Sequence, residues 1–248
     1  MLISGFSIAI DGPGGAGKST IARMLASELG FTHIDTGAMY RAVALFCINE
    51  KIPFEQARVE QRLDDIHITI RHTNGKQHIF LSDEDVSETI RTPAVSEGAS
   101  KVAVFTGVRN KLVALQRQMA ASGNIIMDGR DIGTYVLPSA NVKIYLDACV
   151  NQRTRRRQEE LLSRGIEAEF SQTKAEVVER DYRDCNRESS PLRRAEDAVL
   201  VTTDDMSLEE VKNRLLSIIT DKIQVTGAGE REPLSTGHWP LATDHYER

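Results

Sequence analysis

The glycine-rich stretch from Gly12 to Ser19 is the part of this sequence whose residue types and spacing most directly predict chemistry. It reads GPGGAGKS and fits the P-loop pattern G-x-x-x-x-G-K-[ST]. Glycines let successive backbone N–H groups turn toward phosphate oxygens, and the N-terminus of a following helix adds partial positive charge. The pattern predicts that Lys18 reaches the β- and γ-phosphates of a nucleotide and that the Ser19 hydroxyl binds Mg²⁺. The predicted phosphate-binding residues are Gly12, Pro13, Gly14, Gly15, Ala16, Gly17, Lys18, Ser19 and Thr20, and the alternative is a glycine-rich turn without a ligand.

Two aspartates stand at the ends of predicted strands. The segment FTHID ends at Asp35, and NIIMD ends at Asp128. In an open parallel sheet, ligands bind at the edge where the strands have their C-terminal ends. Asp128 is therefore predicted to hold Mg²⁺, directly or through water. For each of the two aspartates the alternative is a helix or turn cap, and each remains a candidate for the metal contact.

Five short apolar runs predict the strands that position these residues. They are apolar at consecutive positions, as in buried parallel strands, and span residues 6–10, 31–34, 125–127, 142–146 and 199–202. Helical segments separate the runs, which predicts an α/β fold with a parallel five-stranded sheet flanked by helices. We expect a helix after the P-loop that ends near Gly30, and the capping-box spacing of Ser207 and Glu210 predicts a closing helix.

Two insertions and a tail complete the predicted organisation. Apolar and polar residues alternate on both sides of Asn74-Gly75, which predicts a small antiparallel insertion at about residues 63–95. Residues 151–194 are rich in arginine and glutamate and form a second insertion. We expect one domain over residues 1–222, followed by a polar, disordered tail over 223–248.

Composition restricts the class of protein further. The net charge of −5 disfavours a protein that coats nucleic acid or membranes. Cys47, Cys149 and Cys185 are widely spaced and offer neither a disulfide framework nor a zinc site. The histidines have no metal-ligand spacing, and we interpret them as structural or surface residues, with His33 packed in its strand. We expect a cytoplasmic monomer without a signal peptide or a membrane span.

Five segments together resemble the bacterial cytidylate kinases. IDGPGGAGKST, HIDTGAMYRA, MDGRDIGT, VKIYLDA and ERDYRDCNR occur in the order and spacing of that family, over about residues 6–222. DTGAMYR together with DGRDIGT separates this family from other nucleoside monophosphate kinases, which share only the P-loop. The resemblance implies Mg²⁺-dependent transfer of the γ-phosphoryl group of ATP to CMP or dCMP. It also implies that the first insertion binds the nucleoside monophosphate and that the second forms a helical lid and part of the acceptor site.

Arginines are the side chains that such a reaction requires, because two highly charged phosphate groups must be brought together. The resemblance implies that Arg41, Arg130 and Arg187 hold the acceptor phosphate and act in catalysis with Lys18. Its remaining acceptor contacts are Thr36 beside the phosphate (where many members have serine), Arg180 and Asp184 at the sugar, and Ser100, Arg109 and Asp131 at the cytosine edge. A carboxylate, a hydroxyl and a guanidinium complement the amino group and the N3 and O2 acceptors of cytosine.

The segment QRTRRRQEELLSRG resembles the lid that closes over ATP. Arg153 and Arg157 share one helical face, with Arg156 one residue further round. We predict that Arg153 and Arg157 reach the ATP phosphates when the lid closes and excludes water. The alternative is a solvated charged helix in which these arginines pair with Glu159 and Glu160.

Two other functions remain open from the sequence alone. The chain could be a P-loop kinase for another acceptor, such as UMP, AMP, dTMP or shikimate, because one aspartate–arginine pair could tolerate a different base. It could also be a P-loop regulator or a nucleic-acid partner that uses the arginines of residues 151–194. The acidic net charge disfavours the nucleic-acid partner, which would need a broad basic surface.

Overall fold

A parallel sheet of five strands forms the centre of the computed structural model, which describes residues 5–73, 76–121 and 123–225. Its strands are β1 (Ser7–Asp11), β2 (Thr32–Asp35), β6 (Ile125–Gly129), β7 (Val142–Asp147) and β8 (Val199–Thr202), in the order β2-β6-β1-β7-β8. Every pairing in this sheet is parallel. The predicted fold class is confirmed. β8 matches its predicted run, and the other four strands differ from theirs by one or two residues at an end.

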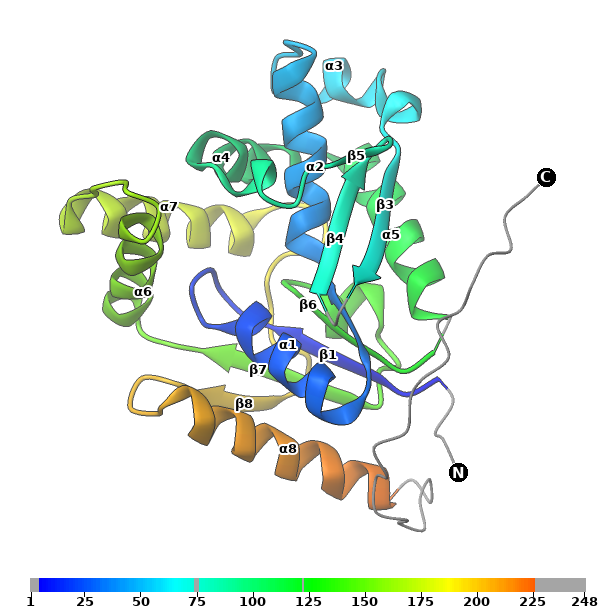
Figure 1. Ribbon diagram of the computed structural model, residues 1–248, viewed down its shortest axis with the longest axis vertical. Coiled ribbons are helices and arrows are strands. Elements are labelled where there is room, and N and C mark those ends of the chain that lie inside the picture. Colours follow the sequence, from blue (N-terminus) through cyan, green and yellow to red (C-terminus); the bar gives the residue numbers. More distant parts are fainter. Residues whose placement is uncertain (1–4, 74–75, 122, 226–248) are drawn as a thin grey trace.

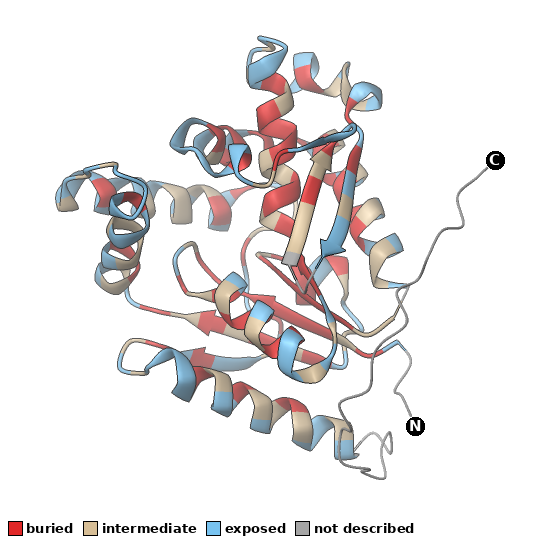
Figure 2. Cartoon of the chain, in the orientation of Figure 1, coloured by how far each residue is buried: buried red, intermediate tan, exposed pale blue. Residues whose placement is uncertain are grey.

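Both faces of the sheet are covered, which explains the consecutive apolar residues. Ile8 and Ile10 of β1 pack on one face and Ala9 on the other. The first face is covered by α1 (Lys18–Leu29) and α8 (Leu208–Val225), and the second by α5 (Thr106–Ala120) and the short π-helix η3 (Ile132–Val136). In Figure 2 the central strands are largely buried, whereas α8 is buried only on the side that faces the sheet. Each strand therefore needs apolar side chains at successive positions.

The predicted C-terminal end of α1 and the predicted start of α8 are confirmed. Gly30 closes α1 in the left-handed conformation at φ 67°, and its N–H donates to the carbonyl of Ala26. Ser207 and Glu210 form the capping box of α8. The carboxylate of Glu210 accepts from the N–H of Ser207 at 2.8 Å, and the Ser207 hydroxyl accepts from the N–H of Glu210 at 3.3 Å.

The first insertion lies between β2 and β6. It includes β3 (Ile68–Thr73), β4 (Lys76–Leu81) and β5 (Glu84–Asp85), which form a separate antiparallel sheet. The helical elements around it are α2 (Thr36–Asn49), α3 (Gln56–Glu60), η1 (Leu63–Asp65), η2 (Thr89–Arg91) and α4 (Pro93–Val102). Ile68, Ile79 and Leu81 pack with α2, so the small sheet rests on that helix. The predicted antiparallel pair is confirmed, whereas its turn residues, Asn74 and Gly75, lie outside the described residues.

The second insertion lies between β7 and β8. It forms α6 (Val150–Leu162) and α7 (Phe170–Asn186), which pack together and extend from the sheet on the left of Figure 1. We call this pair the lid hairpin. At the other end of the chain, α8 reaches Val225, beyond the predicted domain end, and the rest of the predicted tail lies outside the described residues. Among the described helices, none is both long and apolar enough to cross a membrane.

Candidate active site

The P-loop connects β1 to α1 and depends on two glycines. At Gly12, φ is 147°, and a Cβ atom would lie 2.0 Å from the carbonyl oxygen of Leu146. Gly17 precedes the first helical residue and has φ 93°. Only glycine adopts these conformations readily, and at Gly12 only glycine fits the space. The loop therefore delivers the first N–H groups of α1, which have no partners within the helix, to the C-terminal edge of the sheet.

A cluster of cations lies beside this loop. Lys18 is only 6% exposed, and its Nζ donates to the carbonyl of Pro13 at 2.7 Å. Burial, together with the charge of Arg130, lowers the pKa of Lys18 to about 7. Burial and the same arginine lower the pKa of Arg180 to about 10. A Cβ atom on Gly14 would lie 3.4 Å from Nη2 of Arg130, so the guanidinium of that arginine lies close to the loop. Because these cations disfavour one another's charge, the cluster favours a polyanion as its ligand.

Asp128, near the C-terminal end of β6, accepts a hydrogen bond at each of its carboxylate oxygens in the candidate metal site. The Ser19 hydroxyl donates to its Oδ2 atom at 2.7 Å, and Nε2 of His33 donates to its Oδ1 atom at 2.7 Å. Burial by itself would raise the pKa of Asp128, but the bonds from His33 and Ser19 outweigh burial, and this pKa lies below its ordinary value. A hydroxyl and a carboxylate are oxygen donors of the kind that Mg²⁺ prefers, so Ser19 and Asp128 fit that ion. In the described part of the chain, no three His, Cys, Asp or Glu side chains are arranged for a metal.

Asp35 is a helix cap in the structure. Its Oδ1 atom accepts from the N–H of Ala38 at 3.1 Å, and its Oδ2 atom lies 3.7 Å from a guanidinium nitrogen of Arg41. The structure shows Asp35 as a helix cap, which is one of the two roles predicted for it. The ion pair with Arg41 also keeps the Asp35 carboxylate beside the site. Thr36 follows it and donates to the backbone carbonyl of Asp128 at 2.8 Å. The start of α2 is thus joined directly to the end of β6.

Asp131 joins two buried arginines. One of its oxygens accepts from Arg109, and the other accepts from Arg187 at 3.2 Å. Arg187 also donates from Nε to the carbonyl of Ser190 at 2.7 Å. The hydroxyl of Ser100 and Nε of Arg109 are buried without a hydrogen-bond partner among the described residues. Because buried polar atoms are normally paired, these two donors are suited to the edge of a polar ligand.

Arg130 and Asp184 form a further ion pair, which is partly buried. Nε of Arg130 donates to Oδ2 of Asp184 at 2.9 Å. Burial opposes ionisation of Asp184, but the charges of Arg130 and Arg180 keep its pKa below the ordinary value. The structure therefore brings together a predicted phosphate contact, Arg130, and two predicted sugar contacts, Arg180 and Asp184.

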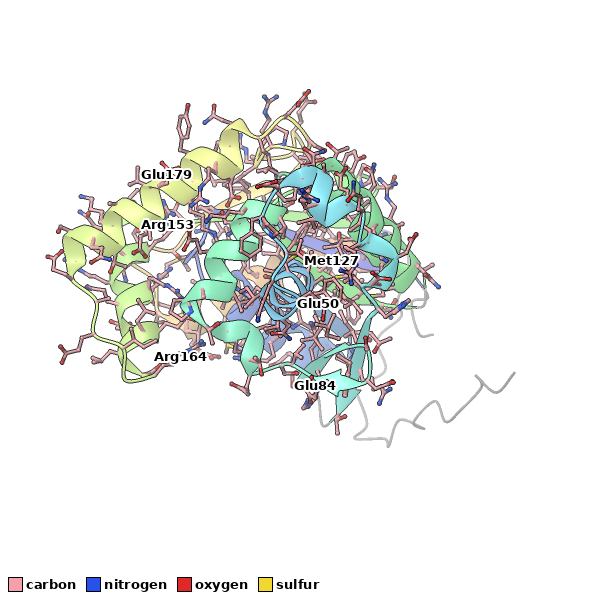
Figure 3. The ribbon with its side chains drawn as sticks, turned by 90° about the horizontal axis from the view of Figure 1, so that it is seen from above. Glu50, Glu84, Met127, Arg153, Arg164 and Glu179 are labelled. Carbon is pink, nitrogen blue, oxygen red and sulfur yellow. The ribbon has the colours of Figure 1, made fainter. Side chains whose placement is uncertain are left out.

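The lid arginines make different contacts from one another. Arg153, labelled in Figure 3, is 4% exposed and donates to the carbonyls of Ala148 and Gly14 at 2.8 and 3.1 Å. It also pairs with Asp181 at 2.6 Å. Arg156 reaches the carbonyls of Gly15 and Thr203, at 3.4 and 3.0 Å. Arg157 instead pairs with Glu160 at 2.7 Å, which is the contact expected of a charged surface helix. The sequence interpretation favoured Arg153 and Arg157, whereas Arg153 and Arg156 are the arginines that touch the P-loop here.

Sequence reasoning missed two residues of this site. Asp11 accepts hydrogen bonds from the N–H groups of Ile132 and Gly133, and His33 holds Asp128. An aspartate that ends a buried strand was the signal used for Asp128, and the same signal would have found Asp11. His33 carries no comparable signal, because its role depends on the neighbouring strand.

The strand order, the P-loop and the buried cations define a P-loop α/β protein with a site for phosphorylated ligands. The family model for cytidylate kinase matches residues 8–221. This chain belongs to the cytidylate kinase family.

Curated relatives named cytidylate kinase match this chain over almost their whole lengths. The protein of Carboxydothermus hydrogenoformans is 49% identical over 219 residues, which are 88% of this chain and 99% of that protein. Those of Caldicellulosiruptor bescii and Acholeplasma laidlawii are 46% and 44% identical, over 86% and 88% of this chain and 94% and 96% of their own lengths. Among solved structures, the shikimate kinase of Acinetobacter baumannii in complex with shikimate has a TM-score of 0.45 and 14% identity, over 87% of this chain and 93% of that one.

Proposed function

We propose that this chain transfers the γ-phosphoryl group of ATP to CMP or dCMP, giving CDP or dCDP and ADP. The observation that carries the proposal is the closeness of Arg130, a predicted acceptor contact, to the predicted donor loop. A Cβ atom on Gly14 would lie 3.4 Å from Arg130, and Arg130 pairs with Asp184. Family membership supports the choice of a cytidylate as acceptor.

The proposed mechanism is positioning with charge neutralisation. The N–H groups of the P-loop and Lys18 bind the β- and γ-phosphates of ATP, while Arg41, Arg130 and Arg187 bind the acceptor phosphate. An oxygen of the acceptor phosphate forms a bond to the γ-phosphorus as the bond from that phosphorus to the bridging oxygen of ADP breaks. The acceptor is already a phosphate anion, so the step requires no general base.

Magnesium fits the site through the oxygen donors of Ser19 and Asp128. These residues would hold the ion directly or through water, and it would neutralise charge on the β- and γ-phosphates. The bond of 2.7 Å between Ser19 and Asp128 supports this assignment, because it directs both side chains to one point. His33 occupies the other oxygen of Asp128 and keeps the carboxylate in that orientation.

The cytosine contacts follow from the unpaired donors. The hydroxyl of Ser100 and Nε of Arg109 are suited to the N3 and O2 atoms of cytosine. Asp131 has lone pairs beyond those used by Arg109 and Arg187, and they can accept from the amino group. For the lid hairpin we propose closure over ATP, in which Arg157 leaves Glu160 and reaches the donor phosphates.

We also propose that the chain acts in the cytoplasm as a monomer on these two small molecules. Cys47, Cys149 and Cys185 are free thiols, which supports a reducing compartment. Sedimentation equilibrium measures the oligomeric state directly, and a stable dimer would contradict the proposal.

A coupled assay of ADP release tests the proposed reaction. The assay uses Mg-ATP with a panel of CMP, dCMP, UMP, AMP, dTMP and shikimate. We expect fast turnover with CMP and dCMP and little with the other acceptors. Fast turnover with another acceptor would keep the kinase and contradict the roles of Arg109 and Asp131. No turnover in a protein that still binds ATP would favour a regulator.

A further inference from the structure

Asp11 makes a pair of hydrogen bonds that the proposed mechanism does not use. It is the last residue of β1, and its side chain is 4% exposed. Its Oδ1 atom accepts from the N–H of Ile132 at 2.7 Å, and its Oδ2 atom accepts from the N–H of Gly133 at 2.7 Å. Because both oxygens are bound, the carboxylate has one orientation.

These bonds connect the two halves of the candidate active site. Asp11 directly precedes Gly12, the first residue of the P-loop, and Ile132 directly follows Asp131. Asp131 in turn follows Arg130, so the donors to Asp11 lie at the start of η3, directly after the two side chains predicted to bind the acceptor. One side chain therefore fixes the start of the ATP-binding loop against the start of the helical turn that follows the acceptor loop.

The fold does not need Asp11 to hold β1 and β6 together. These strands are paired in register from Ser7 and Ile125 to Asp11 and Gly129. The pairing of the two strands ends at Asp11 and Gly129, and each strand then continues into a loop. The side chain of Asp11 bridges the loops at that point, where a small change in spacing moves one substrate relative to the other.

Burying the Asp11 carboxylate carries a large desolvation penalty in return for two hydrogen bonds. Burial raises the pKa of Asp11 to about 6, although the bonds from Gly133 and Ile132 act in the opposite direction. A neutral side chain could cap one of the N–H groups at a lower desolvation penalty. A carboxylate presents a separate oxygen to each N–H group, so it forms a more rigid bridge than a side chain with a single acceptor atom.

We propose that Asp11 is a positioning residue that sets the spacing between the ATP-binding loop and the loop carrying Arg130 and Asp131. It contacts neither substrate and acts through the two loops. Each substrate keeps its own contacts when Asp11 is changed, so binding is preserved while the alignment for transfer is lost. This role rests on the proposed reaction, in which phosphate groups on the two loops must meet in line.

Asp11→Asn is the first test, because it preserves size and removes one of the two acceptors. Its amide NH2 group faces a backbone N–H, so one hydrogen bond is lost. We expect kcat with CMP to fall roughly 10- to 100-fold. The KM values for ATP and CMP, and their Kd values by calorimetry, should change less than about threefold. A role confined to stability would lower the unfolding midpoint and leave kcat unchanged.

Asn124→Ala is the matched control. Oδ1 of Asn124 accepts from the N–H of Phe6 at 2.9 Å, which joins the same two strands at the end remote from the site. This variant also loses one side-chain-to-backbone hydrogen bond. We expect Asn124→Ala to lower the free energy of unfolding by about 1 kcal/mol, as the loss of one hydrogen bond in Asp11→Asn should, and to leave kcat unchanged. An equal fall of kcat in both variants would contradict a positioning role.

Gly133→Ala keeps the test decisive if Asp11→Asn does not fold. A Cβ atom at Gly133 would lie 3.3 Å from Oδ2 of Asp11 and 3.1 Å from Cδ of the flexible Lys143. The added methyl group strains the bridge without changing any charge. We expect kcat to fall at least about threefold, with KM and Kd nearly unchanged as in Asp11→Asn.

Wild-type protein that turns over no acceptor would overturn the proposed reaction. Normal wild-type turnover with unchanged kcat in the folded variants would overturn only the role of Asp11.

Discussion

His33 and Asp128 are joined by a hydrogen bond of 2.7 Å between Nε2 and Oδ1, and both side chains are buried. The other oxygen of Asp128 accepts from Ser19. The backbone carbonyl of His33 lies 2.7 Å from Nε2 of His72 in β3. His33 therefore links the candidate metal site to the antiparallel insertion and holds the carboxylate toward the P-loop.

Replacing His33 should weaken both the fold and the metal site. His33→Ala leaves a buried carboxylate oxygen unpaired, and we expect the free energy of unfolding to fall by about 1–3 kcal/mol. The freed carboxylate turns more easily, so the Mg²⁺ concentration for half-maximal turnover should rise. His33→Gln retains a donor and should restore part of both losses. Urea unfolding and a Mg²⁺ titration measure them, and one Mg²⁺ requirement shared by all three proteins would contradict the link.

Lys18 should make the stability of the nucleotide-free protein depend on pH. Burial lowers the pKa of Lys18 to about 7 in the folded state, from its ordinary value of 10.5. Between these values the unfolded chain binds a proton that the folded protein does not, so stability rises with pH in this window. The slope from this group is at most about 1.4 kcal/mol per pH unit.

Lys18→Met removes this contribution and the proposed contact with the ATP phosphates. We expect turnover to fall by about 10²- to 10³-fold. The stability advantage of the variant over the wild type should be largest near neutral pH and decrease toward higher pH. Urea unfolding of both proteins at several pH values gives this difference. If the difference in unfolding free energy between the two proteins stays constant from about pH 7 to 10.5, burial does not lower the pKa of Lys18.

Asp131 should be needed for both stability and base selection. Asp131→Ala leaves Arg109 and Arg187 buried without their shared carboxylate, which should cost about 3–5 kcal/mol of unfolding free energy. Asp131→Asn keeps the volume and removes the charge, and we expect it to lower the preference for CMP over UMP more than it weakens ATP binding. The ratio of kcat/KM for the two acceptors measures that preference.

Asp197→Asn is the control for the loss of a carboxylate. Asp197 pairs with Lys143 at 2.9 Å but its side chain is 65% exposed. Its replacement should cost no more than about 1 kcal/mol and leave the CMP preference intact. An unchanged CMP-to-UMP ratio in Asp131→Asn would show that another side chain reads the base.

The fold was predictable because its signals are local in the sequence. The apolar runs, the glycine that ends α1 and the capping box at Ser207 each depend on a few adjacent residues. The P-loop was predictable for the same reason, since Gly12 and Gly17 are required by backbone geometry within one short loop. The strand ends were less certain by one or two residues, because pairing with a neighbour decides where a strand stops.

Much of the site was not predictable without the resemblance, because its contacts are distant in the sequence. His33 and Asp128 are 95 residues apart, and Asp11 and Ile132 are 121 apart. Such pairs follow from the strand order, which places β1 and β2 on either side of β6. Likewise, helical periodicity placed Arg153 and Arg157 on one face, but the packing of α6 on the P-loop turned Arg153 and Arg156 toward it.

Arg153 and Arg157 should therefore respond differently to removal. Arg153→Ala breaks the ion pair with the partly buried Asp181 and leaves the carbonyls of Gly14 and Ala148 without this donor. We expect a loss of about 1–3 kcal/mol in the free energy of unfolding. Arg157→Ala breaks a pair with the half-exposed Glu160 and should cost no more than about 1 kcal/mol.

The kinetic effects should distinguish Arg157 from Arg156 if the lid closes as proposed. Arg157 is free to leave Glu160, so Arg157→Ala should raise the KM for ATP several-fold while the fold stays intact. Arg156→Ala is the matched comparison, because Arg156 is already bound to Gly15 and Thr203 in the present position of the lid. A raised KM for ATP in Arg156→Ala, with none in Arg157→Ala, would make Arg156 the lid contact and leave Arg157 in its surface pair. Because Arg153 holds the base of α6 to the P-loop, its loss would impair either arginine, and it cannot decide between them.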